Sequence, residues 1–538
     1  MSHRQWWLMA IGGVGILAII SLFLRPLIAV DETRYITVAW EMWDRGQFLV
    51  PYLNGEFYDH KPPALFWLIH AGWAITGVNE WWPRLIGPLS TLLSLWLLMR
   101  LGSRLWPERP GIGRVGALMF LGSWFIAFYQ TALMFDMPLL ATIALAWLCL
   151  VNAAHTGLKR YWVGFGVALG LGLLVKGPVA LVYTLPVAFA FRWWAPVDAP
   201  KFAPASAAWI ALLALAVPGL WLAAAWWHGS EAYFSKLLLD QTLNRVSGEM
   251  GHPRPWYWYL PLLVLLPFPW TLWWPAWRGL GKTLGNMEDR ANRFLVVAMG
   301  ATLLILSLVG GKQVHYLIPL SALFSLALSR GLHDPRWRVS RHHMLVPALV
   351  MSPLLIMVII LAGKAAGVDL RAGIAEIPLW SLALLTLIPI SLMLSPPSDP
   401  VLAARRLAAA SLTFCAIAML VIYPIVRPVY DSAAAGDYVG RQQARGRPVI
   451  YVGNYQGEFG FFGRLRQPVI ELSPELAERW IDQHPDGLVV SRLKRLRLEG
   501  EPRPEYQQRY RSDTLLMFRA AELVSTGSGL REPTSNEY

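Results

Sequence analysis

The chain has 538 residues, of which 55% are hydrophobic, 15% are charged and 28 are tryptophan. Soluble globular proteins carry about a quarter charged residues, so this composition excludes a soluble protein of ordinary make-up. The formal net charge is +13. On a soluble chain such a charge would indicate a nucleic-acid partner.

Apolar runs recur along the chain from residue 6 to about residue 427. A run of about 20 apolar residues is long enough to cross the hydrocarbon core of a bilayer as a helix. The pattern predicts thirteen spans, at 6–29, 82–99, 115–133, 137–154, 161–175, 178–191, 207–227, 257–277, 294–309, 315–329, 344–363, 377–395 and 407–426.

The first apolar run could also be a signal peptide, because Arg4 precedes it. The run is long, however, and Arg25-Pro26 follows it where a cleavage site would need small residues. We therefore expect a retained helix. The two cysteines, Cys149 and Cys415, fall inside predicted spans, so no disulfide framework is indicated.

The distribution of charge predicts the orientation in the membrane. The N-terminal segment and the six loops on its side of the thirteen spans hold 19 Lys/Arg against 6 Asp/Glu, whereas the opposite short loops hold 10 against 13. The positive-inside rule places the first set in the cytoplasm and accounts for much of the net charge without nucleic acid. The loops at 30–81, 134–136, 228–256 and 310–313, and everything after residue 427, are expected on the outer face.

The first outer loop, 30–81, is too long for a simple connection. After Asp31-Glu32, apolar residues recur at helical spacing up to Trp43, and Gly46 follows where a helix would end. A second short apolar stretch, 63–76, follows Lys61-Pro62-Pro63, and the prolines place Lys61 just ahead of a helix. The loop therefore predicts two helices lying along the membrane surface, joined by residues 51–60.

Two acidic residues of the outer face have alternative interpretations. Asp31, followed by Glu32, stands where a span meets a surface helix, and a carboxylate there can act as a general base or bind a cation. Asp136 stands at the start of the fourth span, ahead of Pro138. Either aspartate could instead simply cap its helix, and spacing alone does not separate the two roles.

Several cations are predicted on the same face as these acids, namely Lys61, Lys176, Arg245, Arg254 and Lys312. Lys176 and Lys312 each stand beside glycines at a helix junction, where a lysine can also be an anchor that reaches towards the interface. Three histidines of this face, His60, His252 and His315, are weak metal candidates, because no HExxH or CxxC spacing accompanies them. No cofactor is indicated, although a divalent metal stays open.

The last part of the chain, 428–538, is more polar. It predicts strands at Pro448–Val452, Pro468–Leu472, Leu488–Ser491 and Thr514–Phe518, and a helix starting at Ser473-Pro474-Glu475. We expect a small α/β domain over 428–525, a disordered tail over 526–538, and a membrane domain over 1–427.

A series of motifs in this sequence closely resembles the ArnT-like glycosyltransferases. The opening motif is specific, and further motifs extend the resemblance over most of the chain: Asp31-Glu32-Thr33-Arg34-Tyr35, Glu41-Met42, Gly46, Pro51, Asn54-Gly55, Tyr58, Lys61-Pro62-Pro63, Trp67, Gly77, Arg84, Asp136-Met137-Pro138-Leu139, Lys176-Gly177-Pro178, His252-Pro253-Arg254-Pro255-Trp256-Tyr257, and Gly311-Lys312 with His315-Tyr316-Leu317-Ile318-Pro319.

The resemblance implies a C-type glycosyltransferase fold, related to that of the protein O-mannosyltransferases, with thirteen spans and a small periplasmic domain. It implies inverting transfer of a sugar from a polyprenyl phosphate on the periplasmic side of the bacterial inner membrane, with the N-terminus cytoplasmic. By position, Asp31 and Asp136 would be the catalytic carboxylates. The donor, its phosphate or the substrate would contact Lys61, Arg245, Tyr316, Glu32, Tyr35, Arg254, Lys312 and Lys176.

The family lead is transfer of 4-amino-4-deoxy-L-arabinose from undecaprenyl phosphate to lipid A. Transfer of another hexose or pentose to lipopolysaccharide, another envelope glycan or a protein stays open, because the aminoarabinose branch usually has an acidic residue where His60 precedes Lys61. A transporter or lipid flippase is the competing class. Transporters, however, concentrate ionisable residues near the bilayer midplane, whereas here they gather at one edge.

Overall fold

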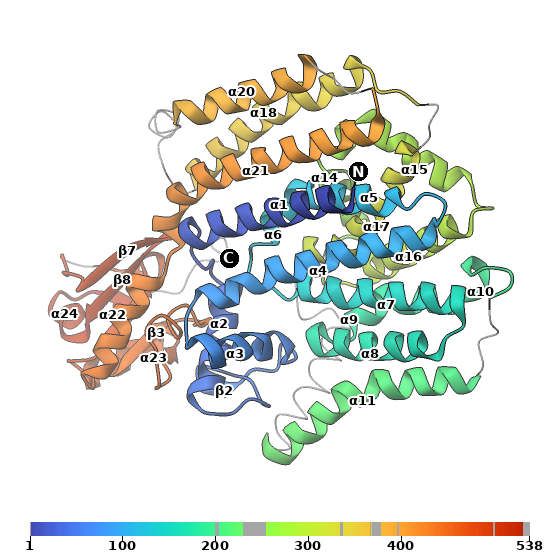
Figure 1. Cartoon of the computed structure of the whole chain (residues 1–538). Coiled ribbons are helices and arrows are strands. Elements are labelled where there is room, and N and C mark those ends of the chain that lie inside the picture. The colour runs from blue at the N-terminus through green and yellow to red at the C-terminus, as the bar shows by residue number, and fades with distance from the viewer. Residues whose placement is uncertain are drawn as a thin grey trace.

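The computed structural model describes residues 2–199, 204–229, 254–333, 337–365, 367, 378–394, 398–498 and 501–530. Most of the chain forms long helices that run side by side as one bundle (Figure 1). A smaller part, built of strands and short helices, lies at one end of this bundle, next to α2 and α3 (Figure 1). This is the architecture of a multi-pass membrane protein with an attached α/β unit.

Within the described residues, seven helices are long and apolar enough to cross a membrane. They are α1 (His3–Leu24), α4 (Trp81–Leu105), α7 (Asp136–Thr156), α11 (Pro204–Gly229), α16 (Arg290–Leu308), α18 (Arg341–Ala365) and α21 (Pro400–Tyr430). The other helices among these spans are α5 (Gly111–Leu121), α6 (Trp124–Tyr129), α8 (Lys159–Lys176), α9 (Val179–Phe189), α10 (Phe191–Trp194), η2 (Trp256–Trp258), α14 (Tyr259–Leu265), η3 (Trp270–Leu272), α15 (Trp274–Gly285), η4 (Val314–Leu317), α17 (Ile318–Leu332) and α20 (Leu379–Leu394).

Four of the thirteen predicted spans are not single helices, and one of them, 315–329, is divided between η4 and α17. The run 115–133 is divided between α5 and α6 at Gly122-Ser123, and 178–191 is divided between α9 and α10. The run 257–277 is divided into four short helical pieces, with Pro267 and Pro269 at the break. A proline lacks the amide hydrogen that a continuing helix needs, so apolar composition alone overestimated the continuity of the last of these runs.

The first outer loop contains the two predicted helices, α2 (Asp31–Asp44) and α3 (Ala64–Thr76). Between them, β1 (Tyr52–Leu53) and β2 (Glu56–Phe57) form a hairpin that turns at Asn54-Gly55, both with positive φ. Asn-Gly is the preferred pair for such a turn. The Glu41 carboxylate of α2 accepts hydrogen bonds from the backbone N–H of Asn54 (2.6 Å) and of Gly55 (3.0 Å), which fixes the hairpin to the helix.

α2 is largely buried in the structure, and its place along the membrane surface stays a prediction. The apolar residues Val38, Ala39 and Met42 are buried, but so is Thr37 on the other side. That polar side packs against the C-terminal α/β part: the Thr37 hydroxyl donates to the carbonyl of Gly457 (2.8 Å), and the Trp40 indole donates to that of Leu465 (3.0 Å). α2 is thus a buried connection between two parts of the molecule.

The C-terminal part contains a five-stranded mixed sheet in the order β4-β3-β5-β8-β7. Its strands are β3 (Val449–Val452), β4 (Ile470–Leu472), β5 (Leu488–Arg492), β7 (Tyr506–Tyr510) and β8 (Asp513–Arg519), with β6 (Leu496–Arg497) and β9 (Gly529–Leu530) paired beside it. β3 runs parallel to β4 and β5, and β8 runs antiparallel to β5 and β7. The helices are α22 (Ala433–Ala444), α23 (Pro474–Gln483), α24 (Ala520–Ser525) and the short η5 (Leu493–Arg495).

The four strands expected here and the helix after Ser473 are confirmed, with Ser473 at the N-cap and proline in the first turn. α22 and β7 were not predicted, since neither has a regular apolar pattern. The segment expected to be disordered begins in the described part of the chain, where residues 529–530 form β9. Residues 531–538 lie outside the described residues.

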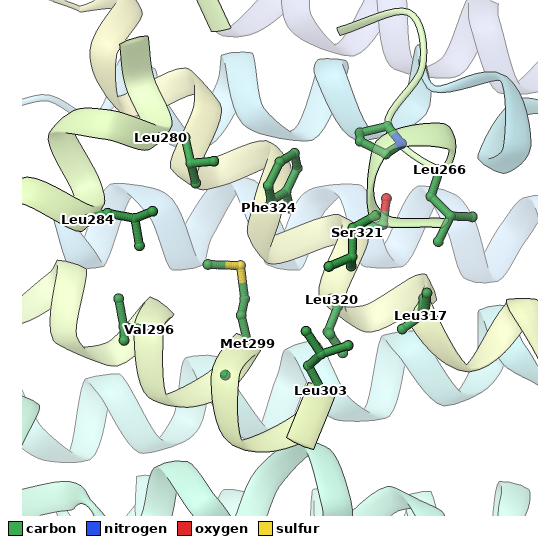
Figure 2. Close-up of a pocket in the computed structure, with 13 residues that line it drawn as sticks. Leu266, Leu280, Leu284, Val296, Met299, Leu303, Leu317, Leu320, Ser321 and Phe324 are labelled. Carbon is green, nitrogen blue, oxygen red and sulfur yellow. The ribbon is translucent and has the colours of Figure 1, made fainter. Parts of the chain in front are cut away.

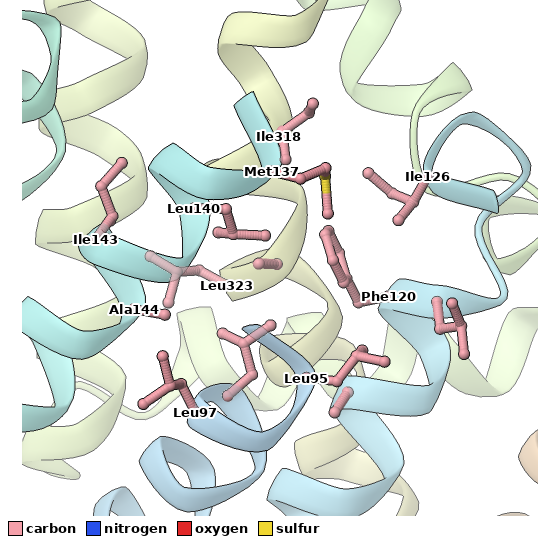
Figure 3. Close-up of a cluster of buried hydrophobic side chains, with 14 of the residues drawn as sticks. Leu95, Leu97, Phe120, Ile126, Met137, Leu140, Ile143, Ala144, Ile318 and Leu323 are labelled. Carbon is pink, nitrogen blue, oxygen red and sulfur yellow. The ribbon is translucent and has the colours of Figure 1, made fainter. Parts of the chain in front are cut away.

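One continuous apolar core joins most of the helices. α7 packs between α4 and α8, and α17 packs against α5, α15 and α16. Figure 3 shows part of this core, with Met137 and Leu140 of α7 close to Ile318 and Leu323 of α17. α7 begins at Asp136 and α17 begins at Ile318. The packing of Met137 close to Ile318 therefore holds the beginnings of these two helices side by side.

Candidate active site

Two buried charges of the candidate site are Asp136, at the first residue of α7, and Lys176, at the last residue of α8. Their side chains form an ion pair with both groups almost inaccessible to solvent. The other carboxylate oxygen of Asp136 accepts a hydrogen bond from the Tyr129 hydroxyl (2.7 Å). Both oxygens of Asp136 are therefore engaged, and the interpretation of Lys176 as an interfacial anchor is wrong.

Helix ends bring this pair together. Lys176 ends α8 because Gly177 takes a positive φ of 72° and Pro178 follows, which favours the start of α9. Asp136 begins α7, but its side chain makes no capping hydrogen bond, and the N-cap position is Phe135. The cap interpretation of Asp136 is therefore not what the structure shows.

Tyr316 borders the buried pair. The ammonium of Lys176 lies 4.8 Å from the centroid of its ring, within the range of a cation–π contact. The Tyr183 hydroxyl, from α9, donates to the backbone carbonyl of Tyr316 (2.8 Å). His315, the preceding residue, stacks on Tyr129 with ring centroids 5.9 Å apart. The short helix η4 is thus tied to the same cluster by three contacts.

Asp31 opens α2 and is the accessible acid of the site, with 53% of its side chain exposed. Val30 occupies the N-cap position, and no side chain caps the helix, so Asp31 is not a capping residue here. Its Oδ1 accepts a long hydrogen bond from Tyr35 (3.4 Å) and lies 3.6 Å from a guanidinium nitrogen of Arg34. Burial raises the pKa of the Tyr35 phenol well above its usual value, so Tyr35 stays a donor.

Glu32 has a different environment from that of its neighbour. It is buried and makes a two-point ion pair with Arg25 (3.0 and 2.7 Å). The same carboxylate accepts from the backbone N–H groups of Ile28 (2.7 Å) and Leu133 (2.6 Å). Through these four contacts, Glu32 joins the end of the first span, α2 and the segment before Asp136. The geometry of Glu32 is therefore that of a structural link rather than a substrate contact.

Aromatic rings link the two acids of the site. Tyr35, which donates to Asp31, packs edge-to-face on Phe135 at 4.9 Å, and Phe135 directly precedes Asp136. Tyr129, which donates to Asp136, stacks on His315. Residues separated by more than two hundred positions in the sequence are therefore brought together at the start of α7.

Lys61 precedes α3, whose N-cap position is Pro63, as the prolines predicted. Its side chain is half-buried and takes part in the interactions of this region. His60 lies beside it, stacked on Tyr58 at 5.3 Å and 3.7 Å from the carboxylate of Asp59. Among the residues that the structure describes, no group of three or more His, Cys, Asp or Glu side chains is placed to hold a metal ion.

Lys312 and Arg254, two further predicted site cations, are joined through the backbone of Arg254. The buried Lys312 ammonium donates to the backbone carbonyls of Arg254 (3.1 Å) and Val309 (2.5 Å). Arg254 is exposed, with its guanidinium 5.1 Å from the centroid of the Trp258 ring. Lys312 is therefore held inside the protein by carbonyl groups rather than serving as an interfacial anchor. Arg245 and His252 lie outside the described residues.

Sequence reasoning missed Tyr129 and Tyr183, which lie inside apolar runs and carry no motif of their own. It also gave Arg34 no role of its own within the opening motif, although Arg34 contacts Asp31. One signal could have found Tyr129. It carries a hydroxyl within an apolar segment, a few residues before the predicted acid Asp136.

An apolar pocket of about 310 Å³ lies beside this cluster, between α14, α15, α16 and α17 (Figure 2). Figure 2 shows aliphatic side chains and Phe324 lining it, with Ser321 the single polar side chain in the lining. Leu317, which lines the pocket, directly follows Tyr316. The pocket therefore extends to the residue next to Tyr316, and its apolar lining is of the kind that accepts hydrocarbon.

Comparison with solved structures identifies the fold. The structure of ArnT from Cupriavidus metallidurans bound to undecaprenyl phosphate matches with a TM-score of 0.76 over 96% of this chain and 98% of that chain, at 15% identity. The same protein in the apo state gives the same TM-score over 97% and 99%. The chain has the C-type glycosyltransferase fold, as the motifs predicted.

Sequence comparisons confirm the resemblance to the ArnT-like glycosyltransferases. A family model described as dolichyl-phosphate-mannose-protein mannosyltransferase matches residues 60–221. An undecaprenyl phosphate-alpha-4-amino-4-deoxy-L-arabinose arabinosyl transferase of Pseudomonas aeruginosa is 30% identical over 62% of this chain and 60% of its own length. One from Pseudomonas fluorescens is 30% identical over 60% and 57%. The match thus spans about 60% of these relatives.

Proposed function

We propose that this chain is an inverting glycosyltransferase that moves 4-amino-4-deoxy-L-arabinose from undecaprenyl phosphate to lipid A. The observation that carries the proposal is the cluster of contacts that joins Asp136 to Lys176 and Lys176 to Tyr316, the residue before Leu317 of the apolar pocket. An anionic lipid needs both a cationic and an apolar surface, and this arrangement offers both. The names of the relatives in Pseudomonas support the choice of sugar and lipid carrier.

In this proposal the cations receive the leaving phosphate. Breaking the bond between the sugar and the phosphate leaves negative charge on the phosphate, and cations held in a water-poor site stabilise that charge. Lys61 is assigned to the phosphate by its position in the Lys61-Pro62-Pro63 motif, and Arg245 and the hydroxyl of Tyr316 are assigned to it by the family resemblance. The ammonium of Lys176 is ion-paired with Asp136. In this proposal its positive charge stabilises the donor phosphate without a direct bond to it.

The two aspartates receive different roles. Asp31 is exposed and has only long contacts, so its carboxylate is free to approach an acceptor. For a hydroxyl acceptor, Asp31 would take the proton as the hydroxyl attacks from the face of the sugar opposite the phosphate. A phosphate acceptor, as on lipid A, is already anionic, and Asp31 would then orient it. Asp136, with both oxygens bonded, holds Lys176 and Tyr129 in position.

The prenyl chain of the donor is assigned to the apolar pocket between α14 and α17. Its lining is aliphatic and continues from Tyr316 through Leu317. The exposed aromatic rings of Trp256 and Tyr257 lie at the start of the same segment, where an interfacial belt is also expected. A lipid with its phosphate at Lys61 and Tyr316 could extend into this pocket.

We also propose the inner membrane of a bacterium as the location, with the N-terminus in the cytoplasm and the C-terminal α/β part in the periplasm. The excess of Lys and Arg in the loops on the N-terminal side supports this orientation. In this arrangement the membrane unit covers about residues 1–427 and the periplasmic unit begins at about 428.

The test uses the purified full chain in lipid nanodiscs with undecaprenyl-phosphate aminoarabinose and lipid A. The expected result is release of undecaprenyl phosphate together with lipid A heavier by one aminoarabinose, measured by mass spectrometry. Undecaprenyl-phosphate hexoses are supplied in parallel, because His60 stands where the aminoarabinose enzymes usually have an acid. No transfer from any donor, together with flux of the sugar lipid across protein-containing liposomes, would replace the transferase by a transporter.

A further inference from the structure

A loop of the C-terminal α/β part, residues 453–463, packs directly on the helix that carries Asp31. Thr37 of α2 is held from two sides: its hydroxyl donates to the carbonyl of Gly457 (2.8 Å) and accepts from the backbone N–H of Phe461 (3.0 Å). These bonds join residues more than four hundred positions apart. The C-terminal α/β part therefore forms part of the surroundings of α2, the helix that begins at Asp31.

Glycines make this close approach feasible. Gly457 has a φ of +83°, and an added Cβ there would lie 2.8 Å from a side-chain carbon of Leu53. A Cβ on Gly460 would lie 2.3 Å from the methyl carbon of Thr37, closer than van der Waals contact permits. The loop thus fits α2 only with these residues in place.

The contact reaches Asp31 through Arg34. One guanidinium nitrogen of Arg34 donates to the side-chain oxygen of Gln456 (2.5 Å). Another lies 3.6 Å from Asp31 Oδ1, well beyond the roughly 2.7–2.9 Å of a charge-assisted hydrogen bond. Gln456 is itself fixed, because its side-chain amide donates to Asn454 and its backbone N–H donates to Glu458 (2.8 Å).

We infer that Gln456 is a positioning residue that holds Arg34 back from Asp31 and so keeps the Asp31 carboxylate available to the acceptor. Asp31 and Arg34 stand three residues apart on one helix, a spacing at which opposite charges readily pair. Without the anchor at Gln456, the guanidinium would close on the exposed carboxylate and occupy an oxygen that the reaction needs. The inference rests on the proposed function, and it gives the C-terminal unit a part in the site.

The principal experiment measures transfer kinetics for Gln456→Met and Gln456→Glu in the full chain. Methionine keeps the size of the side chain but accepts no strong hydrogen bond, whereas glutamate keeps the acceptor oxygen. We expect Gln456→Met to lower kcat about tenfold with the KM for the donor unchanged, and Gln456→Glu to retain activity. Equal kcat for Gln456→Met and the unchanged chain would overturn the inference.

Two further variants separate positioning from loss of docking. Trp40→Phe removes another hydrogen bond between α2 and the C-terminal part without touching Arg34, and should keep kcat. The double variant Arg34→Met/Gln456→Met should be as active as Arg34→Met alone and more active than Gln456→Met alone, since no guanidinium is left to close on Asp31. Additive losses, or an equal loss in Trp40→Phe, would mean that Gln456 only holds the two units together.

A readout independent of transfer is the labelling of Asp31 by a water-soluble carbodiimide and an amine, followed by peptide mass spectrometry. Gln456→Met should reduce labelling of Asp31 several-fold, whereas Trp40→Phe should not. If the unchanged chain transfers no sugar but the labelling changes as expected, the proposed function fails and the geometric inference stands. If transfer occurs but labelling and kcat are the same in all variants, the inference alone fails.

Discussion

The ammonium of Lys176, which ends one helix, is ion-paired with the carboxylate of Asp136, which begins another, and both groups are buried. Each charge is stable in this environment only because the other is present, since an unpaired buried charge is strongly unfavourable. The pair therefore ties the geometry of the site to the stability of the fold, and single substitutions at either position should affect both.

We expect Asp136→Asn to lower stability by about 3–5 kcal/mol, because it leaves the Lys176 charge buried without a counter-charge. Lys176→Met should destabilise similarly by leaving Asp136 unpaired. The double variant Asp136→Asn/Lys176→Met should recover much of the stability while staying inactive. Thermal unfolding in detergent, alongside transfer assays, measures both properties. A double variant no more stable than the singles would show that the pair is not the source of the effect.

Asp31→Asn, unlike Asp136→Asn, should lower transfer activity without lowering stability. The side chain is half exposed and has only long contacts, so its replacement should leave the unfolding temperature and the membrane content of the protein unchanged. Transfer should fall by about 10²–10⁴-fold if the carboxylate takes a proton from the acceptor. Full activity in a normally inserted Asp31→Asn protein would remove Asp31 from the proposed mechanism.

Lys61→Ala should weaken use of the donor, because the proposal places the donor phosphate at this ammonium. Lys61→Arg should retain more activity than alanine, since a guanidinium also binds phosphate. The measurement is the rate against the concentration of the polyprenyl-phosphate sugar, with Lys282→Ala, a lysine of α15 outside the site, as the matched control. Kinetics of Lys61→Ala equal to those of the control would contradict the phosphate contact.

Glu32→Gln should lower the stability of the folded protein more than Asp31→Asn does. Glu32 is buried against Arg25 and accepts two backbone hydrogen bonds, so the amide would leave the guanidinium without its counter-charge. We expect a loss of about 3 kcal/mol or more, seen as a lower unfolding temperature and less folded protein. A Glu32→Gln protein that unfolds normally but cannot use the donor would instead favour the substrate contact that the motif implied.

Glu458 predicts a pH dependence of stability. Burial raises the pKa of this carboxyl above its ordinary value near 4.5, against the lowering effect of backbone hydrogen bonds and of Arg492. A raised pKa in the folded state contributes stability below the unfolded value and loses it as pH rises through the folded value. The stability of Glu458→Gln relative to the unchanged protein should therefore be greater at pH 8 than at pH 5. A difference that falls with pH would contradict this assignment.

The sequence by itself determined the membrane class and the helical nature of both segments in the first outer loop. Apolar runs and helix-ending glycines and prolines act over a few residues, so they can be read without tertiary contacts. The motifs at Asp31, Lys61 and Asp136 predicted two acids and a cation for the site, and their roles there stay predictions. The predicted strands of the C-terminal part followed from the same local patterns.

Only the tertiary structure decided what each charge does. Asp31 and Glu32 are adjacent in the chain, yet one is exposed and the other is enclosed by Arg25 and two backbone amides, because successive residues of a helix face different surroundings. The partner of Asp136 stands forty residues away, and the polar side of α2 is covered by a loop more than four hundred residues away. Local spacing carries no information about such contacts, because packing between distant segments creates them.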